Sequence, residues 1–100
     1  MKIYIAGSIT NNPDYKEQFE KAEKALINKG YEVVNPTKNN ENSYKNYIDA
    51  GLKQLMDCDE IYMLSGYENS KGAMLEKHYA EVAGLKVGEN NESKTTNDRR

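Results

Sequence analysis

Three residues near the end of the chain, Ser70, Gly72 and Glu76, have types and spacing that suit chemistry on an anionic ligand. They open a predicted helix, where the Ser70 hydroxyl can accept a hydrogen bond from a free backbone amide. Gly72 lets a ligand approach the backbone closely. Because the free amides and the helix dipole favour an anion at this point, the pattern predicts a phosphate seat one helical turn from a carboxylate.

Glu76 shares its predicted helix face with small residues, since Gly72, Ala80 and Ala83 fall at the matching spacing. Such a face can pack closely against a neighbouring element, so we expect the carboxylate to be partly desolvated. Desolvation raises the pKa of a carboxyl group and makes it a candidate acid, base or nucleophile. Spacing alone leaves open a second interpretation, in which Glu76 only complements the helix dipole.

The elements that must position these residues alternate along the chain. Helices are predicted to begin at Asn12-Pro13, at Ser43 and at Ser70, and strands are predicted at Lys2–Ala6, Tyr31–Asn35, Ile61–Leu64 and Leu85–Val87. This order predicts an α/β fold of three layers, flavodoxin-like or Rossmann-like, with helices on both faces of a parallel sheet of about four strands.

Three loops should meet at the carboxyl edge of that sheet, where α/β proteins bind ligands. They carry Gly7-Ser8 after the first strand, Asn35-Pro36 after the second, and Ser65–Ser70 after the third. Their convergence beside Glu76 favours a ligand site over a purely structural role for the carboxylate.

Composition predicts one soluble domain over residues 1–88, followed from Glu89 to Arg100 by a disordered polar tail. The net charge of −2 argues against a nucleic-acid polymer as partner, and no apolar run is long enough to span a membrane. A lone cysteine, Cys58, fits the reducing cytoplasm, and it and the lone histidine, His78, argue against a zinc site. We expect neither a metal nor a cofactor.

From Met1 to about Val87 the chain resembles the nucleoside 2-deoxyribosyltransferase superfamily. Within that superfamily it is most similar to the small branch from bacteria and phages, and to nucleotide N-hydrolases. The motifs that carry the resemblance are Ile3–Ser8, Val33–Pro36, Cys58-Asp59 before a strand, and Ser70-x-Gly72-x-x-x-Glu76. The last motif is the specific one.

The resemblance implies that Glu76 attacks the anomeric carbon of a nucleoside or nucleotide and that the base leaves. It also implies phosphate contacts from two serines and a sugar and base pocket at the carboxyl edge. The substrate-binding residues predicted in this way are Tyr4, Gly7, Ser8, Ile9, Asn35, Ser70 and Gly72. Family members form dimers that complete each other's sites, so a homodimer or larger assembly is expected.

Two positions depart from the family pattern. Gly51 stands where many members have an aspartate on the second helix, and Thr10 stands where phosphate-preferring members have an arginine. The predicted function is hydrolysis of the N-glycosidic bond of a nucleotide or deoxynucleotide. Two alternatives stay open: Gly51 favours a protein that binds a nucleotide-derived signal without turning it over, and the family resemblance also allows deoxyribosyl transfer between bases.

Overall fold

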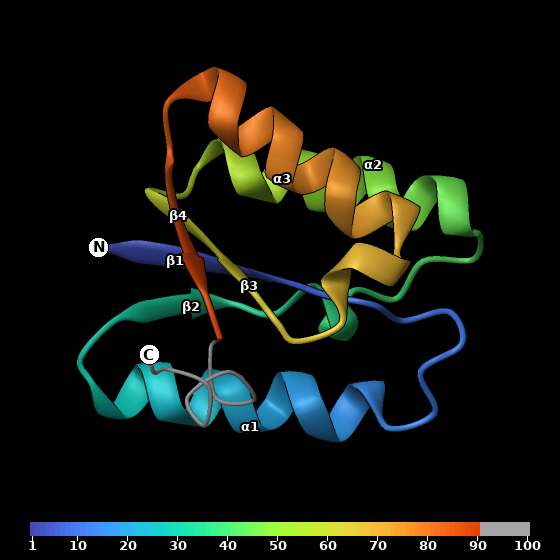
Figure 1. Cartoon of the computed structure of the whole chain (residues 1–100), viewed down its shortest axis with the longest axis horizontal. Helices are drawn as coiled ribbons and strands as arrows, with labels where there is room; N and C mark the ends of the chain where they lie inside the picture. The colour runs from blue at the N-terminus through green and yellow to red at the C-terminus, as the bar shows by residue number, and fades with distance from the viewer. Residues whose placement is uncertain (91–100) are drawn as a thin grey trace, which may run out of the picture.

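The predicted α/β architecture is confirmed in a computed structural model that describes residues 1–90. The elements are β1 (Lys2–Ala6), α1 (Tyr15–Asn28), β2 (Glu32–Val34), α2 (Tyr44–Met56), β3 (Glu60–Met63), α3 (Lys71–Ala83) and β4 (Lys86–Glu89). All neighbouring strands pair in parallel, in the order β2-β1-β3-β4. One helix, α1, lies on one face of this sheet, and α2 and α3 cover the other (Figure 1).

Alternation along the central strand β1 divides the core between the two faces. Ile3 and Ile5 pack toward α1 together with Phe19, whereas Tyr4 and Ala6 face α2 and α3. Since successive side chains of a strand point to opposite faces, this register alone directs Tyr4 toward the third helix. All four of these β1 side chains are buried.

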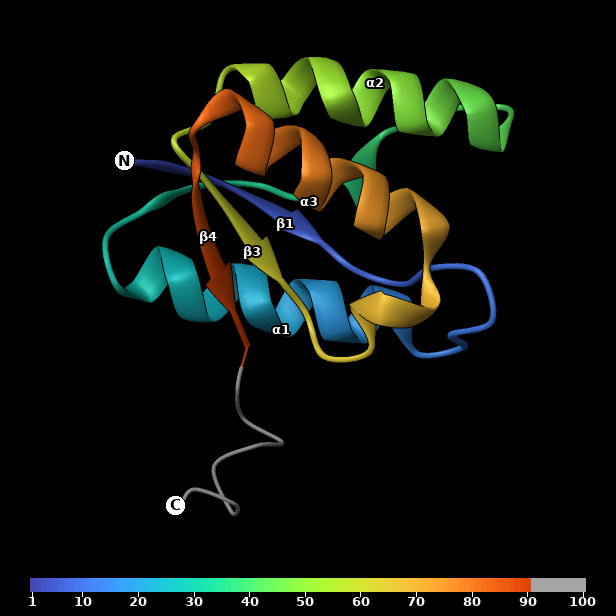
Figure 2. The same cartoon turned by 45° about the horizontal axis from the view of Figure 1, so that its top comes forward.

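The strand order creates a switch point between β1 and β3. The chain leaves β1 toward β2 on one side and then crosses back to β3 on the other, so the loops after β1 and β3 diverge. Figure 2 shows these two loops at the same end of the sheet, beside the start of α3. In open α/β sheets this crevice is where ligands bind.

Most strand ends lie within one or two residues of their predicted positions, and two of the differences from the structure have a clear physical cause. The first helix begins at Tyr15 rather than at Asn12, because the Asn12 side chain closes a turn by accepting a hydrogen bond from the Asp14 amide at 3.3 Å. Glu89, the predicted first residue of a disordered polar tail, is instead the last residue of β4, and the Asn90 amide donates to the Met63 carbonyl at 2.8 Å. Residues 91–100 lie outside the described part of the chain.

Candidate active site

Glu76 lies on the second turn of α3 and is buried, with 4% of its surface exposed. The Tyr4 hydroxyl, which comes from the central strand β1, donates a hydrogen bond to Glu76 Oε2 at 2.9 Å. The two residues are 72 positions apart in sequence. A strand of the sheet therefore holds the carboxylate at the end of the molecule that carries the loops after β1 and β3.

Local backbone chemistry sets where α3 begins. The Ser70 hydroxyl accepts a hydrogen bond from the Ala73 amide at 3.1 Å, which confirms the predicted helix cap. The approach to the helix turns at Gly66, whose φ of +87° is a left-handed conformation that glycine adopts without steric cost. Together the turn and the cap place Glu76 one turn inside the helix, against the sheet.

Burial changes the acidity of this pair. Desolvation raises the pKa of Glu76 from 4.5 to about 7, and the Tyr4 hydrogen bond opposes part of that rise. Burial and the neighbouring carboxylate raise the pKa of Tyr4, so its hydroxyl stays protonated and donates. With a pKa in this range, both the protonated and the ionised form of Glu76 are populated near neutral pH, and the ionised form is poorly solvated.

Gly51, on the facing side of α2, packs directly on this hydrogen bond. A Cβ added at Gly51 would collide with the Tyr4 hydroxyl and lie 2.9 Å from Glu76 Oε2. The aspartate that the family pattern places here would not fit without moving the Tyr4–Glu76 pair. Gly51 is thus the residue that allows α2 to approach the buried carboxylate so closely.

A small cavity of about 10 Å³ borders Glu76. Its lining comes from the ends of β1 and β2, from the first half of α2 and from the start of α3. The lining residues are Ala6, Gly7, Ile9, Pro36, Tyr44, Tyr47, Ile48, Ser70, Gly72, Ala73 and Glu76. A volume of this size holds about one water molecule.

The structure brings most of the predicted site residues together around Glu76. Gly7, Ile9, Ser70 and Gly72 line the cavity with it. Tyr4 is not among the lining residues, and its hydroxyl donates a hydrogen bond to the Glu76 carboxylate.

Two predicted residues lie elsewhere. The Ser8 hydroxyl donates to the Thr10 carbonyl at 3.3 Å and borders a separate polar hollow on the α1 side of the loops. The Asn35 side chain donates to Glu23 at 3.1 Å and accepts from the Thr37 amide and hydroxyl, so its polar atoms are used in holding the turn after β2.

Three of the lining residues, Tyr44, Tyr47 and Ile48, lie on the first turns of α2 and were not among the predicted site residues. The Tyr44 and Tyr47 rings stack with their centroids 6.2 Å apart and their planes 19° apart. Burial and the nearby Glu76 raise the pKa of Tyr47. The signal was present as two tyrosines in one helical turn, but helical spacing alone cannot distinguish a core stripe from a cavity wall.

Two features, a metal-binding cluster and a membrane-spanning helix, are not found in residues 1–90. Within residues 1–90, no cluster of three or more His, Cys, Asp or Glu side chains could hold a metal ion. No helix in this part of the chain combines the length and the hydropathy that a membrane span needs.

Residues 1–89 match the family described as "Domain of unknown function (DUF4406)". Among solved structures, the chain is similar to a 2-desoxiribosyltransferase from Leishmania mexicana, with 26% sequence identity and a TM-score of 0.70. The match covers 88% of this chain and 62% of that one, so this chain spans less than two thirds of the length of its relative. No curated protein matches the sequence.

Proposed function

We propose, from the premise that the chain belongs to the DUF4406 family and to the nucleoside 2-deoxyribosyltransferase-like superfamily, that it cleaves the N-glycosidic bond of a nucleotide or nucleoside. Glu76 is the nucleophile in this proposal. The observation that carries it is the buried Glu76 carboxylate, held by the Tyr4 hydroxyl at 2.9 Å beside the switch point of the sheet. Hydrolysis with release of free base is the reaction we put first.

The reaction has two steps. Ionised Glu76 attacks the anomeric carbon, the carbon–nitrogen bond breaks, and its electron pair leaves with the base, which takes a proton from solvent. A glycosyl ester of Glu76 remains. Water then attacks the anomeric carbon and gives one proton to solvent, the bond from this carbon to the Glu76 oxygen breaks, and the free sugar or sugar phosphate leaves with the Glu76 carboxylate restored. The Tyr4 hydrogen bond keeps one carboxylate oxygen fixed, so the other is the oxygen that attacks.

Deoxyribosyl transfer is the second candidate, because a transferase is among the solved structures that this chain is similar to. A second base would then replace water as the acceptor of the sugar. Non-catalytic binding of a nucleotide-derived molecule is the third, and it is favoured by Gly51, which takes the position of the family aspartate. The three candidates differ in whether free base appears and in what makes it appear.

The test is incubation of the protein at pH 8 with ribo- and deoxyribonucleosides and their 5′-phosphates, followed by chromatography for free base. Parallel reactions contain a second base as acceptor. Hydrolysis predicts free base without the acceptor, whereas transfer predicts a new nucleoside or nucleotide only with it. Glu76→Gln keeps the shape of the side chain and loses its charge, so base release should fall by roughly 10³-fold or more.

Ligand binding is followed on the same variant by thermal shift. Retained binding with lost base release supports Glu76 as nucleophile. If the wild-type protein binds one compound tightly and releases base from none, the enzyme proposal is wrong and the protein is a sequestering one.

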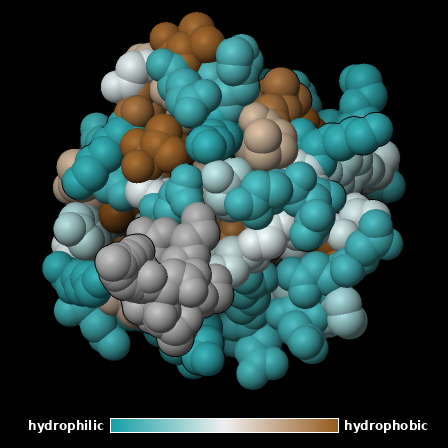
Figure 3. Space-filling view, in the orientation of Figure 1, coloured by the Kyte–Doolittle hydropathy of each residue, from teal (hydrophilic) through white to brown (hydrophobic). Residues whose placement is uncertain are grey.

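We also propose that the protein forms a homodimer through the outer surface of α3. Leu75 and Val82, seven residues apart on one helix face, are 48% and 75% exposed. Hydrophobic surface gathers around α3 in the upper part of Figure 3. Light scattering should report about twice the 11.4 kDa chain mass at micromolar concentration, and the double variant Leu75→Glu, Val82→Glu should report a monomer. A monomeric wild type would contradict this.

A further inference from the structure

The first turns of α2 close the cavity over Glu76. We propose that residues 44–48, called the lid below, must lift from α3 before anything larger than water reaches the carboxylate. The cavity of about 10 Å³ is the reason, because small-molecule sites have volumes of about 300 Å³ or more. The proposal rests on the proposed function only in treating this cavity as the reaction site, and its test measures access alone.

The lid closes the cavity by packing against Gly72, the one residue of α3 that has no side chain. A Cβ at Gly72 would lie 2.6 Å from Ile48 Cδ1 and would collide with the Tyr44 hydroxyl. The tips of Tyr44 and Ile48 therefore occupy the space beside Gly72 in the first turn of α3, close to where an anion would meet the helix amides. A ligand cannot take that seat while the lid is down.

The other walls of the cavity are fixed by the core. A Cβ at Gly7 would lie 3.1 Å from Leu64 Cβ and 3.3 Å from Phe19, so the loop after β1 rests on buried side chains. The α3 wall is anchored by Ala73, which is 2% exposed. Tyr44, by contrast, is 51% exposed. None of the lid's three lining residues is fully buried, so the lid is the wall least anchored in the core.

Hydrogen bonds anchor the chain before the lid, and a glycine weakens the helix after it. Before the lid, the side-chain amides of Asn39 and Gln54 pair at 2.8 and 3.2 Å and tie the incoming chain to the second half of α2. After the lid, Gly51 lowers the helix stability of α2 near its middle. Between these points, the Ser43 hydroxyl accepts from the Asn46 amide at 3.1 Å, so the capped turn can move as one unit.

Carbodiimide labelling of Glu76, followed by mass spectrometry of the peptide that carries it, measures access directly. Wild type should label slowly. Tyr44→Ala removes the plug, and Gly72→Ala pushes it away, so both should label Glu76 at least roughly tenfold faster. The matched control is Tyr31→Ala, which removes a partly buried tyrosine packed on the α1 side of the sheet and should leave the Glu76 rate unchanged.

Amide hydrogen exchange gives a second measurement that needs no substitution. If the lid opens on its own, the amides of Tyr47 and Ile48 exchange much faster than the amide of buried Leu55 in the same helix. The proposal is overturned if the two halves of α2 exchange together, or if Tyr44→Ala and Gly72→Ala fold normally and label Glu76 no faster than wild type. Either result leaves the proposed reaction untouched, since base release is measured separately.

Discussion

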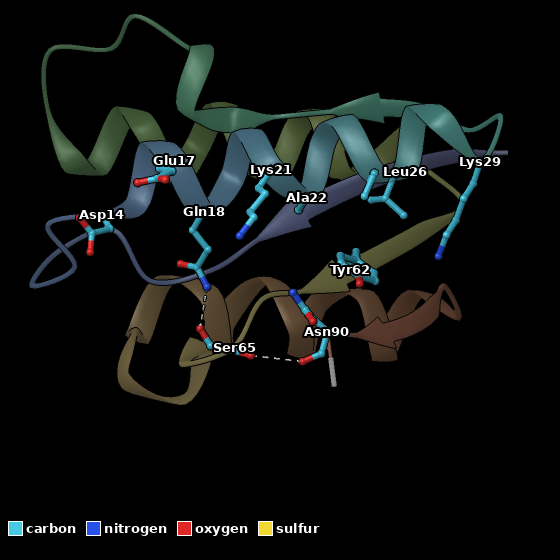
Figure 4. A pocket seen from close by; sticks show the side chains of 11 residues that line it. Asp14, Glu17, Gln18, Lys21, Ala22, Leu26, Lys29, Tyr62, Ser65 and Asn90 are labelled. Atoms are coloured by element: carbon cyan, nitrogen blue, oxygen red, sulfur yellow. Dashed lines mark hydrogen bonds between the residues drawn. The ribbon is translucent and has the colours of Figure 1, made fainter. Parts of the chain in front are cut away.

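The two faces of the sheet each carry a hollow, and the two hollows have opposite characters. On the α1 face, an open groove of about 470 Å³ runs between α1 and the β3–β4 side of the sheet, with Tyr62, Leu26 and Ala22 in its lining (Figure 4). On the α2–α3 face, the cavity beside Glu76 has a volume of about 10 Å³. The charged side chains of the groove are exposed, whereas the carboxylate of the small cavity is desolvated. The larger of these two spaces is therefore not the one that holds the desolvated carboxylate.

Helix coverage explains the difference. A single helix, α1, covers one face of four strands, so Tyr62 on β3 is left only partly buried and an open groove remains beside it. Two helices share the other face, and they approach each other and the sheet through Gly51 and Gly72. Because glycine has no side chain, the two helices can approach each other and the sheet more closely at these positions. The same packing that eliminates free space also removes water from Glu76 and so produces its raised pKa.

The largest expected effect comes from Glu76 on the α2–α3 face. Its raised pKa should make the free energy of unfolding depend on pH. Glu76 has a folded-state pKa of about 7 against 4.5 in the unfolded chain. Between these values the folded state holds the proton more tightly, so the stabilisation present below pH 4.5 is lost as pH rises through 7. The free energy of unfolding should fall by about 3 kcal/mol over that range.

Urea unfolding of wild type and Glu76→Gln at pH 5 and pH 8 checks this prediction. The glutamine variant has no proton to lose, so its unfolding free energy should lack this part of the pH dependence. Base release, if Glu76 is the nucleophile, should rise with pH through about 7 in wild type. Equal pH dependence of stability in the two proteins would contradict the desolvated state of Glu76.

Gly51→Ala tests the packing that seals the cavity. The new Cβ collides with the Tyr4 hydroxyl in a fully buried site, so the variant should lose about 1–3 kcal/mol of stability. In a Tyr4→Phe background the colliding atom is absent, and the same substitution should cost less. A double-mutant cycle by urea unfolding measures that difference. Additive costs would show that Gly51 does not pack on the Tyr4 hydroxyl.

Tyr4→Phe alone should have a smaller effect, because it removes one hydrogen bond and keeps the ring. We expect a loss of about 1 kcal/mol at neutral pH. Since the hydrogen bond lowers the pKa of Glu76, its removal should raise that pKa above the wild-type value of about 7. A shift of the pH–rate profile of base release to higher pH, with full binding retained, is the signature of a positioning residue. An unshifted profile would assign Tyr4 to packing only.

The parts of this site that sequence could predict are those set by local chemistry. The Ser70 cap, the following helix and the burial of Glu76 follow from residues within two helical turns, and the parallel sheet follows from the order of elements.

What could not be predicted depends on contacts between elements. The family resemblance placed Gly51 near the site, but only the structure shows that it packs on the Tyr4–Glu76 hydrogen bond. Asn35 and Ser8 were predicted from their position at the sheet edge, yet each makes its hydrogen bonds within its own loop or to α1. A strand end specifies which residues reach the edge of the sheet, and not which of them turn toward the same cavity.

The smallest expected effect concerns the groove on the α1 face. A large effect there would mean that the groove, and not only the cavity beside Glu76, belongs to the site. Ala25 is an exposed residue of α1 that lines the groove, so Ala25→Tyr places a large side chain in the groove without disturbing the core. Stability should change by less than about 0.5 kcal/mol, because the position is on the surface. Base release should stay the same, since Glu76 lies on the other side of the sheet. If base release instead falls manyfold while the urea midpoint is unchanged, the groove takes part in substrate binding, and the α1 face must be counted as part of the site.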